Sequence, residues 1–148
     1  MPTTLTCQNF PLTLQEVTSL WQATIAYCTF TDEEVSVSCA SSQEIQQLNK
    51  TYRGHDRATN VLTFTYPVDA APFVTTPAEH DIVVCLEVAE QEATERNVAY
   101  KDYVALLLTH AFLHAAGMDH ERSSKEQALT QKAEEEILNT AGFSRVSL

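Results

Sequence analysis

The sequence predicts an α+β fold in a single domain, with a small mixed β-sheet surrounded by helices. Its 148 residues suit one hydrophobic core, and 44% hydrophobic with 20% charged residues is ordinary for a globular chain. Segments of helical and strand periodicity follow in the order helix, strand, helix, strand, strand, helix, helix, helix. The sequence has no internal repeats, low-complexity tracts or linkers, so we expect residues 1–148 to form one domain.

Two capping boxes mark the helices in the first part of the chain. Thr13 with Glu16 precedes an apolar stripe that continues to residue 28, and Ser41 with Glu44 precedes a shorter helix that ends at Gly54. Between these helices, the run EVSVSCA alternates apolar residues with serines, which is the two-residue period of a half-buried strand. This part of the chain is therefore predicted as helix, strand and helix.

Two strands with a long loop between them are predicted in the middle of the chain. NVLTFTY has the branched and aromatic content of a strand, and DIVVCLE is a continuous apolar run suited to a central strand covered on both faces. The intervening run YPVDAAPFVTTPAEH carries three prolines in fifteen residues, which favours a loop. Because most connections are shorter, we expect this loop to border a functional site.

Three helices are predicted in the last part of the chain. Residues 87–96 form an acidic helical pattern, whereas residues 102–116 are apolar on nearly all sides, which predicts a buried helix. Ser123 with Glu126 caps the last helix, which is expected to end near Gly142. Its apolar stripe consists of Leu129, Ala133 and Ile137.

The charge of the chain limits the partners that it is expected to have. A net charge of −11 argues against a general nucleic-acid coat, and DNA is not expected as a partner. Lys50, Arg53 and Arg57 nevertheless form a local basic cluster, offset by Asp56. The sequence has no apolar run of the roughly 18 residues that a bilayer span needs, nor the start of a signal peptide. We therefore expect a cytoplasmic protein without a membrane partner.

The four cysteines are predicted to be free thiols. Cys7, Cys28, Cys39 and Cys85 lie far apart with no C-x-x-C pair, and three of them occupy positions that look apolar in a helix or strand. Buried free thiols are favoured over a disulfide frame or a zinc ribbon, which indicates a reducing compartment.

Three histidines with the spacing H-x3-H-x5-H predict a metal site. In a helix, His110 and His114 are offset by only about 40° with a rise of about 6 Å, so they are neighbours on one face. Gly117 can end that helix and allow the chain to deliver His120 from a loop. A lone histidine on a helix is more often an ordinary side chain, but two on one face of an apolar helix cost free energy unless something satisfies them, and a shared metal does so directly.

The ligand set favours one catalytic Zn²⁺ per chain. Three neutral imidazoles suit zinc, and three protein ligands leave a fourth position for water. Asp119 and Glu121 flank His120 as surface charges or as hydrogen-bond partners of a ligand histidine, and both interpretations remain open. A protease of the H-E-x-x-H kind would need glutamate where this chain has Ala111, so that class is disfavoured.

Three blocks carry a resemblance to a known family: LNKTYRGHDRATNVLTF, HDIVVCLEVA and THAFLHAAGMDHE. In these blocks the chain resembles the YbeY family of bacterial single-strand endoribonucleases, which act in ribosomal RNA maturation and ribosome quality control. The resemblance implies an α+β domain with a zincin-like metal cleft, His110, His114 and His120 as zinc ligands, and Arg53 as the essential arginine. It also implies single-stranded RNA as substrate, including the 3′ end of 16S ribosomal RNA, with a ribosome or ribosomal subunit as partner.

Several positions depart from the usual family pattern, although none removes a proposed ligand or the arginine. Ala111 replaces a usual glycine, Met118 a common tyrosine, Asn60 the usual aspartate and His80 a usual glycine. His80 and His55 are expected on the solvated surface rather than in the cleft.

The resemblance also gives Arg53 a chemical role, because a guanidinium can hold a phosphate through two parallel hydrogen bonds. Lys50 and Arg57 either steer the substrate or are simply exposed. Since the acidic protein repels RNA, weak activity alone and marked salt dependence are expected. The alternatives are a zinc hydrolase acting on peptides and a ribosome-associated binding module with a structural metal.

Overall fold

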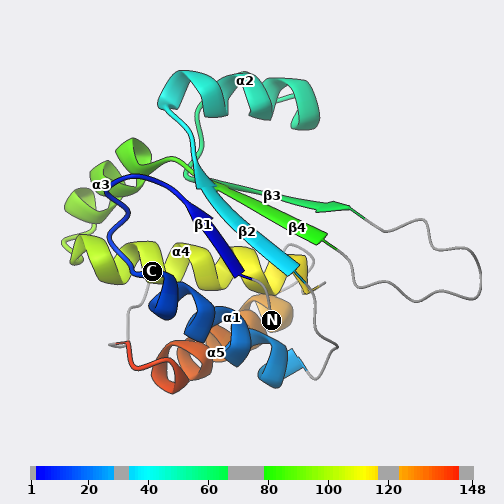
Figure 1. Cartoon of the computed structure of the whole chain (residues 1–148), viewed down its shortest axis with the longest axis vertical. Coiled ribbons are helices and arrows are strands. Elements are labelled where there is room, and N and C mark those ends of the chain that lie inside the picture. The colour runs from blue at the N-terminus through cyan, green and yellow to red at the C-terminus, as the bar shows by residue number, and fades with distance from the viewer. Residues whose placement is uncertain (1–2, 29–33, 67–78, 117–123, 144–148) are drawn as a thin grey trace, which may run out of the picture.

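The fold is seen in a computed structural model that describes residues 3–28, 34–66, 79–116 and 124–143 (Figure 1). These ranges contain four strands and five helices, and they confirm the predicted α+β class with its small mixed sheet. Within them, none of the helices combines the length and the apolarity that crossing a bilayer requires. Gly117, His120 and their neighbours lie outside the described residues.

The sheet has the strand order β1-β2-β4-β3. The strands are β1 (Thr3–Thr6), β2 (Glu34–Cys39), β3 (Val61–Tyr66) and β4 (Glu79–Val84). β1 pairs with β2 and β2 with β4 in parallel, whereas β3 pairs with β4 antiparallel and forms one edge of the sheet. β1 was not predicted, because the short run TTLT becomes a strand through its pairing with β2 and has no clear apolar alternation of its own.

Four helices pack on or beside one face of the sheet (Figure 1). They are α1 (Leu14–Cys28), α3 (Leu86–Glu95), α4 (Tyr100–Ala115) and α5 (Ser124–Thr140). α4 is buried along most of its length, as its apolar sequence predicts, and contacts α1, α3, α5 and β3. At the centre of this core, the Trp21 ring meets Phe112 of α4 edge to face, with 5.1 Å between the ring centroids.

The helix α2 (Ser42–Arg53) lies alone on the other face of the sheet among the described elements (Figure 1). The capping boxes predicted for α1 and α2 are present. At α2, the Ser41 hydroxyl accepts from the Glu44 N–H, and the Glu44 carboxylate accepts from the Ser41 N–H. Ser123, the predicted cap of the last helix, lies outside the described residues. Ile45 of α2 packs with Leu62 and Cys85 in a small second core. α2 ends where Gly54 takes the left-handed conformation at φ 73°, as predicted.

The bounds of the predicted long loop and of the strand that follows it differ from the structure. The expected loop over residues 66–80 is shorter, because Tyr66 belongs to β3 while Glu79 and His80 belong to β4; residues 67–78 lie outside the described residues. The expected strand over residues 81–87 ends at Val84, since the next residue already begins the turn into α3. Apolar residues suit both a central strand and a buried helix start, so periodicity alone does not locate the change.

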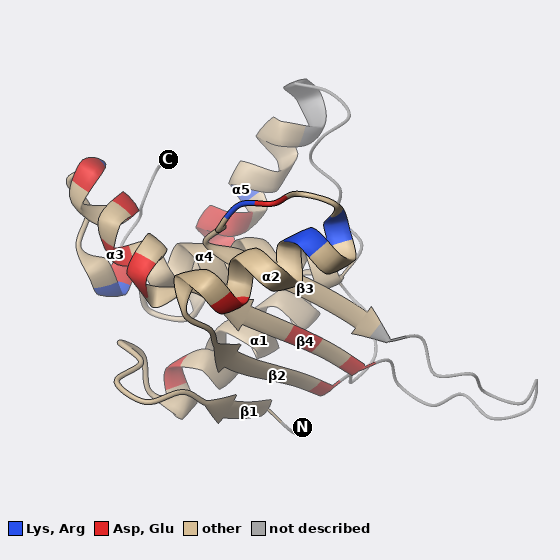
Figure 2. Cartoon of the chain, turned by 90° about the horizontal axis from the view of Figure 1, so that it is seen from above, with Lys and Arg blue, Asp and Glu red and all other residues tan. Residues whose placement is uncertain are grey.

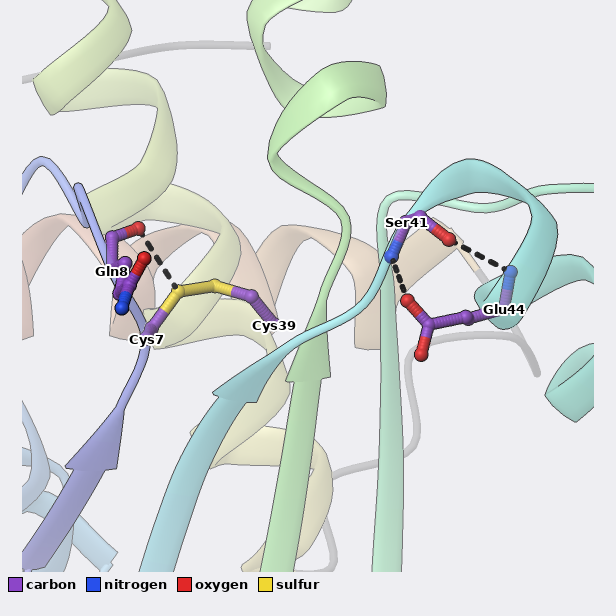
Figure 3. The surroundings of a disulfide bond; sticks show 5 residues. All are labelled: Cys7, Gln8, Cys39, Ser41 and Glu44. Atoms are coloured by element: carbon purple, nitrogen blue, oxygen red, sulfur yellow. Dashed lines mark hydrogen bonds between the residues drawn. A yellow bond between two sulfur atoms is a disulfide. The ribbon is translucent and has the colours of Figure 1, made fainter.

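The prediction of four free thiols is wrong for two of them. Cys7 and Cys39 form a disulfide with a Cα–Cα distance of 5.5 Å (Figure 3). The parallel pairing of β1 with β2 sets Thr6 opposite Ser38, so the next residues of both strands are neighbours. Without β1, the sequence offered no reason to pair them. Cys28 and Cys85 are free thiols, and Cys85 is buried.

Candidate active site

His110 and His114 stand side by side on α4, as their spacing predicts. Their rings stack with 6.0 Å between centroids and 29° between planes. Both side chains are partly exposed, although the residues between them, Ala111, Phe112 and Leu113, are buried. The pair therefore forms a polar, partly exposed site on a mainly apolar part of the helix.

A buried carboxylate of α5 orients one of these histidines. Glu134 Oε2 lies 3.0 Å from His110 Nδ1, and the Glu134 side chain is only 6% exposed. An ionised carboxylate accepts hydrogen bonds, so this contact favours a proton on Nδ1 and the lone pair on Nε2. That is the arrangement of a histidine prepared to bind a metal through Nε2.

Glu134 was not predicted as a site residue, and in the sequence it is the first residue of the acidic run Glu134-Glu135-Glu136. The predicted apolar stripe of α5 was also wrong at Leu129, which is 51% exposed. The buried face of α5 instead contains Thr130, Ala133, Glu134, Ile137 and Leu138. This spacing of three and four residues was the available signal, because a carboxylate on the buried face of a helix needs a partner.

The opposite wall of the site comes from the end of α2 and from the edge strand β3. One cavity of about 310 Å³ joins these elements to α4. Arg53 lies in this wall, and one of its five N–H donors meets the Thr63 carbonyl at the long distance of 3.4 Å. The residues around the cavity that carry chemical groups include Arg53, His55, Arg57, Asn60, His110 and His114.

The other two histidines have different places. His55 is exposed, as expected, but it also lines this cavity. The expectation of a solvated His80 is wrong: it is 2% exposed, hydrogen-bonded to Thr65 at 3.0 Å and edge-on to Trp21. Alternate residues of β4 are buried, and His80 occupies one of these buried positions.

Asn60, in the cavity wall, is held by a hydrogen-bond network with Glu92 and Tyr103. Its amide donates to Glu92 at 2.9 Å, and the same Glu92 oxygen accepts from the Tyr103 hydroxyl at 2.9 Å. Burial, followed by the hydrogen bond to Glu92, raises the pKa of Tyr103 to about 12. Tyr103 therefore remains a neutral donor, and Asn60 remains fixed.

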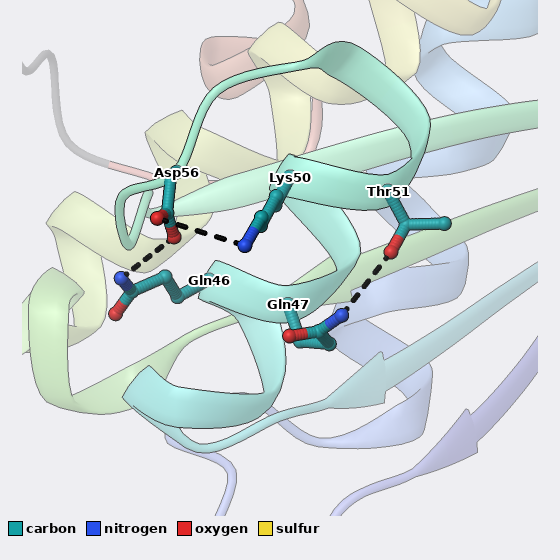
Figure 4. Close-up of polar contacts among 5 residues, drawn as sticks. All are labelled: Gln46, Gln47, Lys50, Thr51 and Asp56. Carbon is teal, nitrogen blue, oxygen red and sulfur yellow. Dashed lines mark hydrogen bonds and ion pairs between the residues drawn. The ribbon is translucent and has the colours of Figure 1, made fainter.

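The basic cluster lies at the end of α2 and just after it (Figure 2), whereas acidic residues recur on α3 and α5. Asp56, the one acid within it, accepts from Gln46 at 3.1 Å and lies 3.9 Å from Lys50 (Figure 4). Both charged groups are exposed, so this ion pair contributes little to stability. Arg53 and Arg57 line the cavity.

The predicted third ligand, His120, lies outside the described residues together with Asp119 and Glu121. Within residues 3–28, 34–66, 79–116 and 124–143, no three His, Cys, Asp or Glu side chains are grouped to hold a metal ion. The described part of the predicted zinc site is thus the pair His110 and His114 with the carboxylate behind it.

The fold and cavity define a class: a single α+β domain that carries paired imidazoles and a guanidinium on the walls of one polar cavity. A family model described as endoribonuclease YbeY matches residues 5–142. The endoribonuclease YbeY of Delftia acidovorans is 41% identical over 113 residues, which cover 76% of this chain and 70% of that protein. That of Verminephrobacter eiseniae is 40% identical over 120 residues, covering 81% and 73%. The chain belongs to the endoribonuclease YbeY family.

A solved structure agrees with this assignment. The solution structure of TM1509 from Thermotoga maritima is 27% identical, with a TM-score of 0.57 over 93% of this chain and 89% of that one. The resemblance inferred from the three sequence blocks is therefore confirmed at the level of family and fold.

Proposed function

We propose that this protein is a zinc-dependent endoribonuclease that cuts single-stranded RNA at the cavity between α2 and α4. The observation that carries the proposal is the joining of Arg53, His110 and His114 in one polar cavity beside the edge strand β3. Membership of an endoribonuclease family supports RNA as the substrate.

The residues present fit a zinc ion. His110 and His114 would hold it, with Glu134 fixing the orientation of the first ring, and His120 is the proposed third ligand. When bound, Zn²⁺ supplies Lewis acidity toward an oxygen of the substrate or the attacking group.

Arg53 is the proposed binding group for the phosphate. Cleavage of a phosphodiester increases the negative charge on the nonbridging oxygens, whether the nucleophile is water or a ribose 2′-hydroxyl. The Arg53 guanidinium presents a planar fork of donors that matches two such oxygens, and its contact to Thr63 uses one donor. Arg57 and His55 line the same cavity and add positive charge or hydrogen bonds there.

The proposed biological substrate is ribosomal RNA, including the 3′ end of 16S ribosomal RNA, and the proposed partner is a ribosome or ribosomal subunit. A net charge of −11 repels RNA as a whole, so a partner that presents an exposed strand would overcome this repulsion. We expect weak cleavage by the protein alone, with a role in ribosome quality control and a cytoplasmic location.

Metal analysis together with RNA cleavage tests the proposal. We expect about one zinc per chain, and losses of about 100-fold or more in cleavage of an unstructured RNA by His114→Ala and Arg53→Ala, since both remove charge stabilisation. Lys101→Ala is the control, because Lys101 pairs with Glu16 of α1 and does not line the cavity. Circular dichroism checks that each variant folds.

The other outcomes distinguish the alternatives. Peptide hydrolysis that survives Arg53→Ala would indicate a peptidase, although the buried Ala111 supplies no general base. A melting temperature that falls on chelation, without any RNA cleavage by the wild type, would indicate a structural metal in a binding module. A metal-free wild type of full activity would overturn the zinc proposal.

A further inference from the structure

A second cavity of about 620 Å³ adjoins the candidate active site on the side of α2 and β3. The two cavities share Arg53, His55 and Thr63, so they meet at the proposed phosphate-binding arginine. The second cavity differs in its remaining lining, which includes Tyr52 and Phe64. A strand of RNA bound at Arg53 would therefore have an aromatic wall beside it.

Tyr52 is unusually exposed for a large aromatic residue. It is 66% exposed, more than any other large hydrophobic residue among those described, and its ring meets Phe64 edge to face at 5.3 Å. A single exposed aromatic residue needs no explanation on an ordinary surface. Here the aromatic pair lines a cavity that it shares with a cationic side chain, which is the combination that single-strand binding sites use.

Unpaired bases are the chemical group that fits this wall. Every base has a face that can stack on an aromatic ring, whereas a base within a duplex is already stacked on its neighbours. The adjoining cations, Arg53 and the neighbouring Arg57, match the phosphates that join successive bases.

We propose that Tyr52 and Phe64 form a subsite that stacks one unpaired base of the RNA while Arg53 holds the adjacent phosphate. This inference rests on the proposed RNA cleavage and deepens it. It gives the single-strand preference a structural origin, because a paired base cannot reach the Tyr52 ring without leaving its stack. The stacking is independent of base identity, so the subsite selects strandedness rather than sequence.

The test combines two variants with two RNAs. The first RNA is an unstructured oligonucleotide, and the second carries an abasic nucleotide in place of the base next to the cut. We expect Tyr52→Ala to lower kcat/KM about 5- to 150-fold, the usual range for loss of one stacked base. Tyr52→Phe should recover most of this loss, since it keeps the ring. Tyr27→Ala is the control, because Tyr27 is an exposed tyrosine of α1, on the far side of the sheet.

The decisive comparison is whether the effects of Tyr52→Ala and of removing the base are independent of each other. If Tyr52 stacks that base, the abasic RNA should be a poor substrate for the wild type, and Tyr52→Ala should lower its cleavage no further. The subsite would be overturned if Tyr52→Ala lowered cleavage of the abasic RNA by the same factor as cleavage of the intact RNA. It would also be overturned if Tyr52→Ala were as active as the wild type on the intact RNA. Either result would leave the endoribonuclease assignment intact.

A binding measurement separates this inference from the function on which it rests. In the His114→Ala background, an RNA carrying 2-aminopurine next to the cut site should lose fluorescence on binding, and Tyr52→Ala should abolish that loss. If the wild type cuts no RNA, the proposed function fails, and quenching that depends on Tyr52 would still support a base subsite. Quenching that is the same with and without the Tyr52 ring would overturn it.

Discussion

At the scale of single residues, the Glu134 carboxylate orients the first histidine of the proposed zinc site. It is buried, and it lies 3.0 Å from His110 Nδ1. A carboxylate in this position sets the tautomer of the imidazole and raises its basicity toward a metal. The same contact compensates for burying a charged group on the inner face of α5.

Replacing this carboxylate should weaken zinc binding without removing a ligand. We expect Glu134→Gln to lower zinc affinity about 10- to 100-fold, because a neutral amide orients the ring less strongly. Titration of zinc into the metal-free protein, against a competing chelator, measures the change. The exposed Glu136→Gln of the same helix is the control and should bind zinc like the wild type. Equal affinity of all three proteins would show that the carboxylate only fills the core.

At the scale of elements, the first end of α2 stabilises the helix, and its second end positions residues of the site. The capping box at Ser41 starts the helix, whereas the left-handed Gly54 ends it between two residues of the site, Arg53 and His55. A Cβ on Gly54 would meet no atom within 4 Å, so a substitution there acts through backbone conformation alone. The termination of α2 therefore positions the guanidinium at the cavity.

Substitutions at the two ends should cost similar stability but differ in activity. We expect Gly54→Ala to destabilise the fold by about 1–2 kcal/mol through its positive φ, and Ser41→Ala by about 1 kcal/mol through the lost cap. Only Gly54→Ala should lower RNA cleavage, by about tenfold or more, because it displaces the binding group. Urea unfolding and RNA cleavage assays measure both effects. Equal activity of the two variants would show that the end of α2 does not position Arg53.

At the scale of the whole molecule, the proposed RNA site is a local basic region on an acidic protein. Three of the nine lysines and arginines fall within residues 50–57, whereas the net charge is −11. The overall field therefore opposes RNA binding, and only contacts at the cavity favour it. The proposed need for a partner that presents the strand follows from this balance.

Salt should weaken RNA binding in proportion to the number of phosphates contacted. For about three contacts, we expect the logarithm of the association constant to fall with a slope of about −2 against the logarithm of salt concentration. Arg57→Ala should reduce that slope by about 0.7. The control Lys101→Ala, which removes an ion pair with Glu16, should leave it unchanged. Fluorescence anisotropy of labelled RNA measures the slope. If Arg57→Ala left the salt dependence of RNA binding unchanged, Arg57 would not contact an RNA phosphate.

Much of this protein is determined by its sequence alone, wherever the signal is local. The capping boxes of α1 and α2 and the adjacent pair His110 and His114 depend on residues three or four positions apart, which a helix makes neighbours. The left-handed end of α2 depends on one residue, Gly54, which accepts a positive φ. The three sequence blocks also indicated the family correctly.

Only the tertiary structure decided the features that join distant segments. β1 and the disulfide from Cys7 to Cys39 depend on pairing with β2, and the buried place of His80 depends on which face of β4 meets the core. Glu134 contacts His110 because α5 packs on α4, and Arg53 lines the same cavity as these histidines because α2 ends beside β3. Local periodicity can indicate which residues of an element are buried, but it does not identify their partners, because the free energy of these contacts comes from burial and pairing between elements far apart in the chain.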